Sequence, residues 1–394
     1  MNFLYTISTR LYVVAIHIAS LFNTKAKLWV KGRKNIFNKL VDATKGEQNI
    51  VWFHCASLGE YEQGKPIIEA YKVKHPKHKI LLTFFSPSGY EIRKNTSLAD
   101  FVFYLPYDTK SNARRFISIT NPIKVVFIKY EFWFNYMSEL KKQNIPFYSV
   151  SAIFRENQTF FKYKWFAKQL KNVTYFFVQN KTSADLLKSI GFTNTSISGD
   201  SRFDSVLETT KNPKTFSLIE MFCQSNPTII CGSTWPKDES ILAEYIIKNP
   251  DKNYIIAPHE LRYISDLQKQ TDALLYSKAN EKNIMMSNVL IIDSIGILSN
   301  IYQYANIAYI GGGFGAGIHN ILEAATFGLP VIFGPNYKKF NEAKDLITLG
   351  GSISIANYQE LNLAIKHFNI FDSTISTDYI KNHSGATKII LEAL

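Results

Sequence analysis

The sequence is poor in cysteine and lacks a long apolar segment. Its three cysteines, Cys55, Cys223 and Cys231, form neither a metal-ligand pattern nor an even set for a disulfide framework. So sparse a set is typical of proteins from a reducing compartment. The clean apolar run near the N-terminus covers only residues 11–22, which is short of the roughly 20 residues that span a bilayer. No small-residue cleavage site follows it, so we do not expect a removed signal peptide.

Signals for nucleic-acid binding, short internal repeats and low-complexity tracts are also missing. The formal net charge is +13, an excess that would suit nucleic acid, an anionic membrane or an acidic substrate. The lysines are scattered and no nucleic-acid-binding motif accompanies them, so we expect no nucleic-acid partner. A genome that favours Lys, Asn, Ile and Phe codons explains part of the charge.

The chain is long enough and apolar enough for two domains. It has 394 residues, of which 46% are hydrophobic, and this suffices for a core in each half. Short apolar runs alternate with helical segments, which predicts parallel sheets covered by helices on both faces. We expect an N-terminal helix with a basic flank over residues 1–35, one domain over 36–205 and a second over 206–394. The expected strands are 50–54, 79–84, 101–105, 124–128, 146–150, 173–179, 228–231, 253–257, 288–292, 305–310 and 331–333.

The most informative stretch, residues 311–340, has the pattern of a strand end, a glycine turn, a short helix, a strand and a proline turn. Four of its first five residues are glycines, which let a backbone turn sharply and approach a ligand closely. We expect a helix from His319 and Asn320 to Gly328, whose free first-turn N–H groups form an anion site suited to a nucleotide phosphate. Asn320 and Glu323 also have capping-box spacing, so Glu323 alternatively serves only the helix start.

Polar residues gather directly after the expected strands, at 57–60, 86–89, 233–235, 258–260 and 311–320. Because ligands bind at the carboxyl ends of parallel strands, these clusters are candidate binding residues. The last cluster also contains a loose dinucleotide fingerprint. It lies late in the chain and lacks the acidic residue after the next strand, so we expect no nicotinamide cofactor.

Residues 3–22 predict an N-terminal helix that lies on a membrane or is anchored in it. A basic flank follows the helix, made up of Lys25, Lys27, Lys31, Arg33 and Lys34. Such a flank favours the cytoplasmic side of the membrane. The alternative is a core helix of the first domain.

Seven segments along the chain form a recognisable set of motifs: FHCASLGE at 53–60, TFFSPSGYE at 83–91, YEFWFN at 130–135, GDSRFD at 199–204, CGSTWPKDE at 231–239, IIAPHE at 255–260 and GGGFGAGIHNILEAATFGLPVIFGP at 311–335. Together they resemble bacterial 3-deoxy-D-manno-octulosonic acid (Kdo) transferases of the lipid A pathway. The match runs along nearly the whole chain. Its specific part is the combination of Ser-x-Gly-Glu in the first half with His-Asn-x-Leu-Glu in the second.

The resemblance implies an α/β GT-B glycosyltransferase fold, with two Rossmann-like parallel-sheet domains facing a cleft and an N-terminal membrane-associated helix. It implies that Glu60 is the catalytic base, which takes the proton from the acceptor hydroxyl. The residues implied for the cytidine nucleotide are Pro258, His259, Ile295, Gly296, Ile297, Asn320, Ile321, Leu322 and Glu323. Further donor or acceptor contacts are expected from Ser57, Gly59, Ser88, Glu131, Arg202, Ser233, Thr234 and His319.

Three positions depart from the family pattern. The family often has an acidic residue where Ile297 stands, so a side-chain contact there is in question. A basic residue often follows the proline at 258, where this chain has His259. The usual lysine of the GDSRFD-like segment is Arg202 here, which keeps the charge.

The implied reaction is direct, inverting transfer of Kdo from CMP-Kdo to a lipid A precursor, a phosphorylated and acylated disaccharide like lipid IVA. No Asp-x-Asp pair is present, so we expect no metal and no cofactor besides the donor. The expected location is the cytoplasmic side of the inner membrane. Two alternatives stay open. One is a GT-B transferase that uses a uridine sugar nucleotide; the other is a non-catalytic lipopolysaccharide-binding membrane protein, in which Ser57 and Glu60 form only a capping box.

Overall fold

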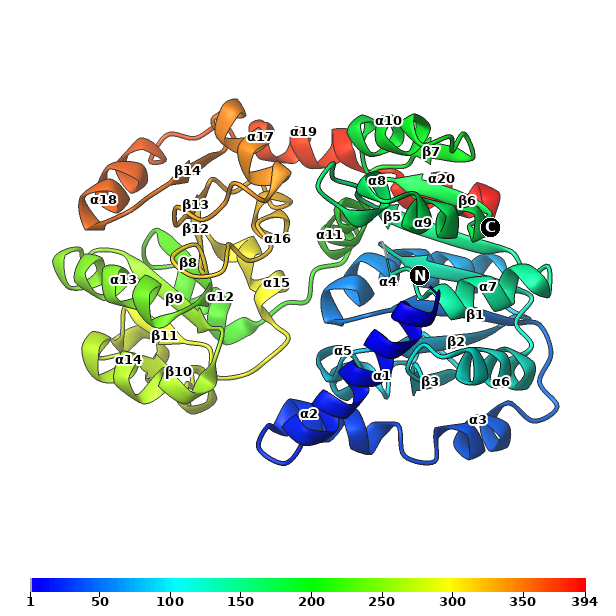
Figure 1. Ribbon diagram of the computed structural model, residues 1–394. Coiled ribbons are helices and arrows are strands. Elements are labelled where there is room, and N and C mark those ends of the chain that lie inside the picture. Colours follow the sequence, from blue (N-terminus) through cyan, green and yellow to red (C-terminus); the bar gives the residue numbers. More distant parts are fainter. Residues whose placement is uncertain (1, 130) are drawn as a thin grey trace. The chain divides into compact units, whose positions relative to one another are not determined.

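The computed structural model describes residues 2–129 and 131–394, and the chain folds into two compact units (Figure 1). The first unit comprises Met1–Ser205 and Ser384–Leu394, and the second comprises Val206–His383. The second unit therefore differs from the expected domain 206–394, because the C-terminal segment packs elsewhere. Helix α20 (Ala386–Ala393) buries Ile390 in the core of the first unit.

The first unit is built on a seven-stranded sheet whose neighbouring strands are all parallel. In spatial order the strands are β3 (Phe101–Tyr104), β2 (Lys79–Phe84), β1 (Ile50–Cys55), β4 (Lys124–Ile128), β5 (Phe147–Ala152), β6 (Tyr175–Val178) and β7 (Thr195–Ile197). Every residue of β1 is buried, as expected for a central strand covered on both faces. The six strands expected in this unit are confirmed in position, and β7 is an additional strand.

Helices connect these strands in chain order. They are α1 (Asn2–Ala19), α2 (Thr24–Gly32), α3 (Ile36–Thr44), α4 (Leu58–Lys74), α5 (Pro87–Arg93), α6 (Lys110–Thr120), α7 (Phe134–Lys142), α8 (Thr159–Lys162), α9 (Lys164–Gln169), α10 (Lys181–Ser189) and α11 (Arg202–Lys211). A short 3-10 turn, Leu170–Asn172, precedes β6.

The second unit has its own seven-stranded parallel sheet. In spatial order its strands are β10 (Leu274–Leu275), β11 (Val289–Ile291), β9 (Asn253–Pro258), β8 (Thr228–Thr234), β12 (Ile307–Ile310), β13 (Val331–Phe333) and β14 (Ser352–Ser354). The prediction of two helix-covered parallel sheets in tandem is confirmed.

The helices of this unit are α12 (Ser217–Cys223), α13 (Pro236–Lys248), α14 (Ile264–Thr271), α15 (Leu298–Ile301), α16 (Leu322–Ala325), α17 (Asn341–Leu349), α18 (Tyr358–His367) and α19 (Thr374–His383). Short 3-10 turns lie at Leu261–Tyr263, Tyr276–Lys278, Ile284–Met286 and Tyr302–Tyr304.

The N-terminal helix α1 is docked on the first unit along one face only. The Tyr5 hydroxyl donates a hydrogen bond to the Asp108 carboxylate, and Val13 is buried. Other apolar side chains of the helix face solvent, among them Leu11 and Ile18, which are 63% and 60% exposed. Within the part of the chain that the structure describes, no helix has both the length and the apolar character needed to cross a bilayer.

Candidate active site

The strand order of each sheet reverses between two strands that both lead into predicted site residues. In the first unit the reversal lies between β1 and β4, and in the second between β8 and β12. At such a switch point the loops leaving the two strands diverge, and the space between them is the usual ligand site of an open parallel sheet. Each unit therefore has a candidate site at the carboxyl ends of two central strands.

Glu60 lies in the first turn of α4, directly after β1, and its carboxylate is held at both oxygens. The Ser57 hydroxyl donates to Oε2, and Nζ of Lys129 lies 3.4 Å from Oε1. The Glu60 side chain is 16% exposed. Neither hydrogen bond of a capping box is found between Ser57 and Glu60, both of which the structure describes. The carboxylate is thus not used to close the end of the helix.

Lys129, which sequence reasoning did not single out, follows β4 at the other side of the switch point. Its backbone is left-handed, with φ 64°, a conformation that is costly for a residue with a side chain. Two bonds to β5 hold it there: the Lys129 N–H donates to Val150 O and the Ser149 hydroxyl donates to Lys129 O, each at 2.8 Å. No sequence pattern signals such a conformation.

Glu131 is two residues further along the same loop. Burial raises the pKa of its carboxyl to about 7, and the negative charge of Glu60 adds to the rise, whereas Lys129 opposes it. The first switch point therefore carries two interacting carboxyl groups, those of Glu60 and Glu131, and one ammonium group, that of Lys129. Such coupling of acidic groups is common where protons are moved.

Ser88 lies in the first turn of α5, and Gly59 lies in the first turn of α4 next to Glu60. A Cβ at Gly89 would lie 3.0 Å from the Ser57 backbone, so glycine permits this close approach of the two helix starts. Ser88 is exposed, and its hydroxyl is 3.0 Å from that of Ser86. Gly59 is also exposed. The structure thus brings the predicted segments 53–60 and 83–91 together.

Arg202 contacts the same region through its neighbour Asp200. The guanidinium lies 2.8 Å from the Asp200 carboxylate, which also accepts from the Gln63 amide of α4 at 3.1 Å. Burial tends to raise the pKa of Asp200, but the Arg202 charge and these hydrogen bonds hold it below its usual value. The charge of Arg202 is therefore largely balanced within the chain.

In the second unit the glycine turn after β12 packs tightly against β8 and β13. A Cβ at Gly311 would lie 2.3 Å from Ser233 O, and one at Gly313 would lie 2.6 Å from the Gly334 backbone. Ser233 itself is left-handed, with φ 54°, at a register shift where β8 pairs with β9. Strained backbone thus occurs at this switch point as well.

Asp238, in the first turn of α13, ties the glycine turn to β8 and was missed from the sequence. Its carboxylate accepts hydrogen bonds from the Trp235 N–H at 3.0 Å, the Gly312 N–H at 3.0 Å and the Tyr309 hydroxyl at 2.8 Å. The pattern Trp235-x-x-Asp238 has capping-box spacing, so a signal for it was present.

Three rings stack at the carboxyl edge of the second sheet. The ring of His259 lies 4.7 Å from that of Trp235 and 4.5 Å from that of His319. The Trp235 indole N–H donates to Nε2 of His319 at 3.1 Å. Burial lowers the pKa of His319 to about 4, with His259 adding to the effect. His319 is therefore neutral at physiological pH, with its proton on Nδ1 because Nε2 accepts.

The predicted helix from His319 to Gly328 is wrong in its extent, because α16 covers only Leu322–Ala325. The His319 N–H donates to Gly311 O at 3.1 Å, so the chain folds back over the glycine turn. The Leu322 N–H donates to the Asn320 side chain at 3.2 Å. Within the described residues, only the N–H groups of Asn320 and Ile321 in this segment have no acceptor.

The Asn320 side-chain amide also donates to Glu323 Oε1 at 3.0 Å. The two residues expected to share a capping box are thus joined through their side chains. Glu323 is partly buried, whereas Ile321 and Leu322 are buried. Contacts from the last two to a ligand would therefore come from the backbone.

Pro258 and His259 end β9 and are joined to β8, because the His259 N–H donates to Thr234 O at 2.9 Å. The Thr234 hydroxyl in turn donates to Glu239 at 2.9 Å. These residues lie at the carboxyl ends of β9 and β8, next to the switch point.

Ile295, Gly296 and Ile297 follow β11, which is separated from β8 by β9. Ile295 is 88% exposed and Gly296 is left-handed, with φ 102°. The turn leads into α15, where Leu298 packs near Gly232 of β8. It lies on the same edge of the sheet, but further from the reversal than the other predicted residues.

Comparison with known proteins shows which proteins this chain is similar to. A family model described as 3-deoxy-D-manno-octulosonic-acid transferase (kdotransferase) matches residues 31–205. The chain is 28% identical over 326 residues to the 3-deoxy-D-manno-octulosonic acid transferase of Rickettsia bellii, covering 79% of this chain and 77% of the relative. It is 26% identical over 338 residues to that of Aquifex aeolicus, covering 83% and 88%.

Residues 31–205, which the family model covers, belong to the Kdo transferase family, and the two relatives that align over 79% and 83% of the chain are both Kdo transferases. The chain is accordingly a glycosyltransferase. Among solved structures, it is similar to a UDP-GlcNAc 2-epimerase from Neisseria meningitidis, with a TM-score of 0.60, 16% identity, and 87% and 98% of the two chains covered. It is also similar to MurG from Acinetobacter baumannii, with a TM-score of 0.54, 11% identity, and 88% and 99% covered. These likenesses concern the fold, which is of the GT-B type with two Rossmann-like units.

Proposed function

We propose that this Kdo transferase moves Kdo from CMP-Kdo to a lipid A precursor, with Glu60 as general base. The observation on which this rests is the position of Glu60 at the switch point of the first sheet, with Ser57 and Lys129 holding its two carboxylate oxygens. A base must be fixed within hydrogen-bond reach of the hydroxyl that it deprotonates. A partly exposed carboxylate, oriented by two neighbours, meets that need.

The second switch point supports binding of the cytidylate. The N–H groups of Asn320 and Ile321, which follow the glycine turn, have no acceptor among the described residues and can donate to a phosphate. The stacked rings of His259 and His319 add polar ring nitrogens at the same edge of the sheet. When CMP leaves, negative charge grows on its phosphate, and fixed N–H donors stabilise such charge.

In this mechanism the acceptor hydroxyl loses its proton to Glu60 and attacks the anomeric carbon of Kdo from the face opposite to CMP. The new glycosidic bond forms as the bond to the cytidylate phosphate breaks, and configuration is inverted. The proton remains on Glu60 until it passes to solvent. The step draws its electrostatic support from backbone N–H groups and uses no metal.

The N-terminal helix supports a location at the cytoplasmic face of the inner membrane. Its outer face exposes apolar side chains such as Leu11 and Ile18, and Phe22, just beyond it, is 89% exposed. A basic flank follows, in which Lys25, Lys27, Lys31 and Lys34 are exposed, whereas Arg33 is buried in the first unit. Apolar side chains with neighbouring cations are the features that hold a helix at an anionic membrane surface. At that position the enzyme would reach the headgroup of a lipid acceptor whose acyl chains stay in the bilayer.

The decisive experiment incubates the purified chain with CMP-Kdo and a tetra-acylated glucosamine disaccharide bisphosphate, and resolves the products by mass. We expect an acceptor heavier by one or more Kdo units, together with CMP. Calorimetric titration with CMP and with UDP tests the donor separately. Binding of UDP without binding of CMP, and no mass increase of the acceptor, would contradict the proposal and favour a uridine sugar donor.

A further inference from the structure

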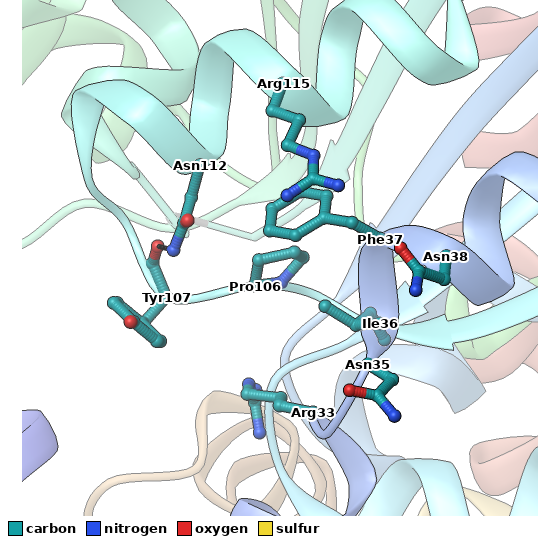
Figure 2. A pocket seen from close by; sticks show the side chains of 9 residues that line it. All are labelled: Arg33, Asn35, Ile36, Phe37, Asn38, Pro106, Tyr107, Asn112 and Arg115. Atoms are coloured by element: carbon teal, nitrogen blue, oxygen red, sulfur yellow. Dashed lines mark hydrogen bonds between the residues drawn. The ribbon is translucent and has the colours of Figure 1, made fainter.

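A pocket in the first unit is bordered by cations and amides. It has a volume of about 240 Å³ and lies between the start of α3, the end of β3 and the first turns of α6 (Figure 2). Its polar side chains are those of Arg33, Asn35, Asn38, Tyr107, Asn112 and Arg115. None of the described residues that line it is acidic. The volume is below the roughly 300–1,000 Å³ of pockets that enclose a whole small ligand, so it suits one substituent of a larger molecule.

Arg33 is a buried cation without an anionic partner. The residue is 9% exposed. Its guanidinium donates to the carbonyl oxygens of Leu105 and Phe85, each at 2.8 Å, and of Trp29 at 3.2 Å, and it lies over the rings of Trp29, Phe85 and Tyr104. Among the described residues, no carboxylate pairs with it. Burial lowers its pKa to about 9, so it remains charged at neutral pH. Carbonyls and rings stabilise the cation but do not neutralise it, so an anion bound beside it is attracted by its full charge.

Two further groups at the pocket favour an anion. The Arg115 guanidinium lies over the Phe37 ring, 4.4 Å from its centroid (Figure 2), and no described carboxylate pairs with it. Helix α3 begins at Ile36, and the side chain of the preceding Asn35 does not cap it. The Ile36 N–H donates to Arg33 O, but no side-chain acceptor among the described residues serves the first turn, and a helix start of this kind attracts negative charge.

A larger groove of about 610 Å³ adjoins the pocket and shares Tyr107 and Asn112 with it. The groove is lined by Thr6, Arg10, Val13 and Val14 of α1 and by Thr109, Lys110 and Ser111 around the start of α6. The charged pocket thus continues, within the same unit, into a groove with two apolar side chains and two further cations. A molecule that fits both has an anionic group attached to an apolar body.

We propose that the pocket around Arg33 and Arg115 binds a phosphate monoester on the headgroup of the lipid acceptor, with an acyl chain along Val13 and Val14 of the groove. The inference rests on the proposed function, and it adds the subsite that recognises the acceptor. Arg115 provides the cleanest test, because it is exposed and its guanidinium packs only on Phe37.

The first experiment compares Arg115→Gln with Arg114→Gln, since Arg114 is the exposed neighbour that does not line the pocket. We expect Arg115→Gln to raise KM for the bisphosphorylated acceptor about tenfold, as for loss of a charge-assisted bond. The kcat and the KM for CMP-Kdo should stay unchanged, and Arg114→Gln should behave as wild type. An unchanged acceptor KM in Arg115→Gln, or an equal rise in Arg114→Gln, would overturn the proposal.

Asn35→Asp separates binding from folding. Asn35 has a left-handed backbone that aspartate also tolerates, and a negative charge at the start of α3 interacts favourably with the helix dipole, so the melting temperature should not fall. The same carboxylate repels a phosphate, so the acceptor KM should rise. A lower melting temperature with an unchanged acceptor KM would mean that the pocket serves only the fold, which overturns the proposal.

Vesicle sedimentation keeps this inference distinguishable from the proposed function. Phosphatidylcholine vesicles with the bisphosphorylated acceptor should bind wild type more strongly than Arg115→Gln, and vesicles with the dephosphorylated acceptor should bind both equally. If that difference appears but no Kdo is transferred, the proposed function fails and the subsite stands. If inorganic phosphate raises the melting temperature of wild type only, while vesicle binding and acceptor KM are unaffected by Arg115→Gln, the pocket takes free phosphate and the lipid assignment is overturned.

Discussion

The two switch points of this molecule have the same topology and opposite chemistry. In the first unit, the loops after β1 and β4 carry charged groups: Glu60, Lys129 and Glu131. In the second unit, the loops after β8 and β12 carry glycines and neutral rings, and the buried acids Asp238 and Glu239 accept hydrogen bonds from their own unit. The first arrangement suits proton transfer, and the second suits holding an anion by backbone N–H groups.

The two sites also share one feature, a left-handed residue with a side chain at the critical strand end. Lys129 has φ 64° and Ser233 has φ 54°. Each is costly, and each directs its neighbours into the switch point. The comparison teaches that the strand order determines where a site forms, whereas the loop residues determine what it does.

The largest effect should come from removing the carboxylate of the first site. Glu60→Gln should lower kcat by about 100-fold or more, because a general base contributes roughly 10²–10⁴-fold, while CMP binding measured by calorimetry stays unchanged. Glu62→Gln is the matched control, since Glu62 lies on the same helix and pairs with Arg93 at the surface. Full activity of Glu60→Gln would show that the first site does not supply the general base, which is the function that distinguishes it from the second site.

The next effect tests the backbone of the second site. Gly313→Ala puts a Cβ 2.6 Å from the Gly334 backbone, so it should destabilise the second unit by about 1–3 kcal/mol and weaken CMP binding. Gly315→Ala is the control, because its nearest contact is 3.6 Å. Calorimetry and thermal melts measure both. Equal behaviour of the two variants would show that the close approach at Gly313 is unimportant.

A smaller effect concerns Glu131 and stability. Its pKa is raised from 4.5 to about 7 in the folded chain, so its contribution to stability is fully present below about pH 4.5 and is lost as pH rises through about 7. Glu131→Gln mimics the protonated acid. Its melting temperature relative to wild type should therefore rise from pH 5 to pH 8, and Glu62→Gln should show no such trend. If the melting temperatures of wild type and Glu131→Gln changed with pH in parallel, burial would not be raising the pKa of the Glu131 carboxyl.

The smallest effect is a spectroscopic one. Burial lowers the pKa of His319 to about 4, so its ring proton resonance should stay flat from pH 8 to pH 5. His319→Gln identifies the resonance by its loss. A titration midpoint near pH 6 would mean that the second site carries a charged ring and would weaken its contrast with the first.

Much of the fold could be predicted from apolar runs alone, and the exceptions have a common cause. The strands that were missed are β7, β10 and β14, and two of these, β7 and β14, are partly polar. All three lie at the edges of their sheets. An edge strand has one neighbour and less burial, so its sequence need not be a continuous apolar run.

The candidate site could be predicted where a residue type follows a strand directly, as for Glu60 after β1 and His259 after β9. The helix from His319 was predicted wrongly, because the His319 N–H bonds to Gly311 and the chain turns back. Lys129 could not be predicted, since its role depends on a left-handed backbone held by β5. Long-range hydrogen bonds of this kind leave no local pattern.

The return of residues 384–394 to the first unit has a consequence for biosynthesis. The Asp204 carboxylate accepts hydrogen bonds from the N–H groups of Gly385 at 2.6 Å and Thr387 at 2.7 Å. Ile390 lies in the same hydrophobic core as Val51 and Phe53. A ribosome makes this segment only after the entire second unit. Until then, part of the apolar surface of the first unit stays uncovered while the second unit is synthesised. Exposed apolar surface of this kind promotes aggregation and is what chaperones bind.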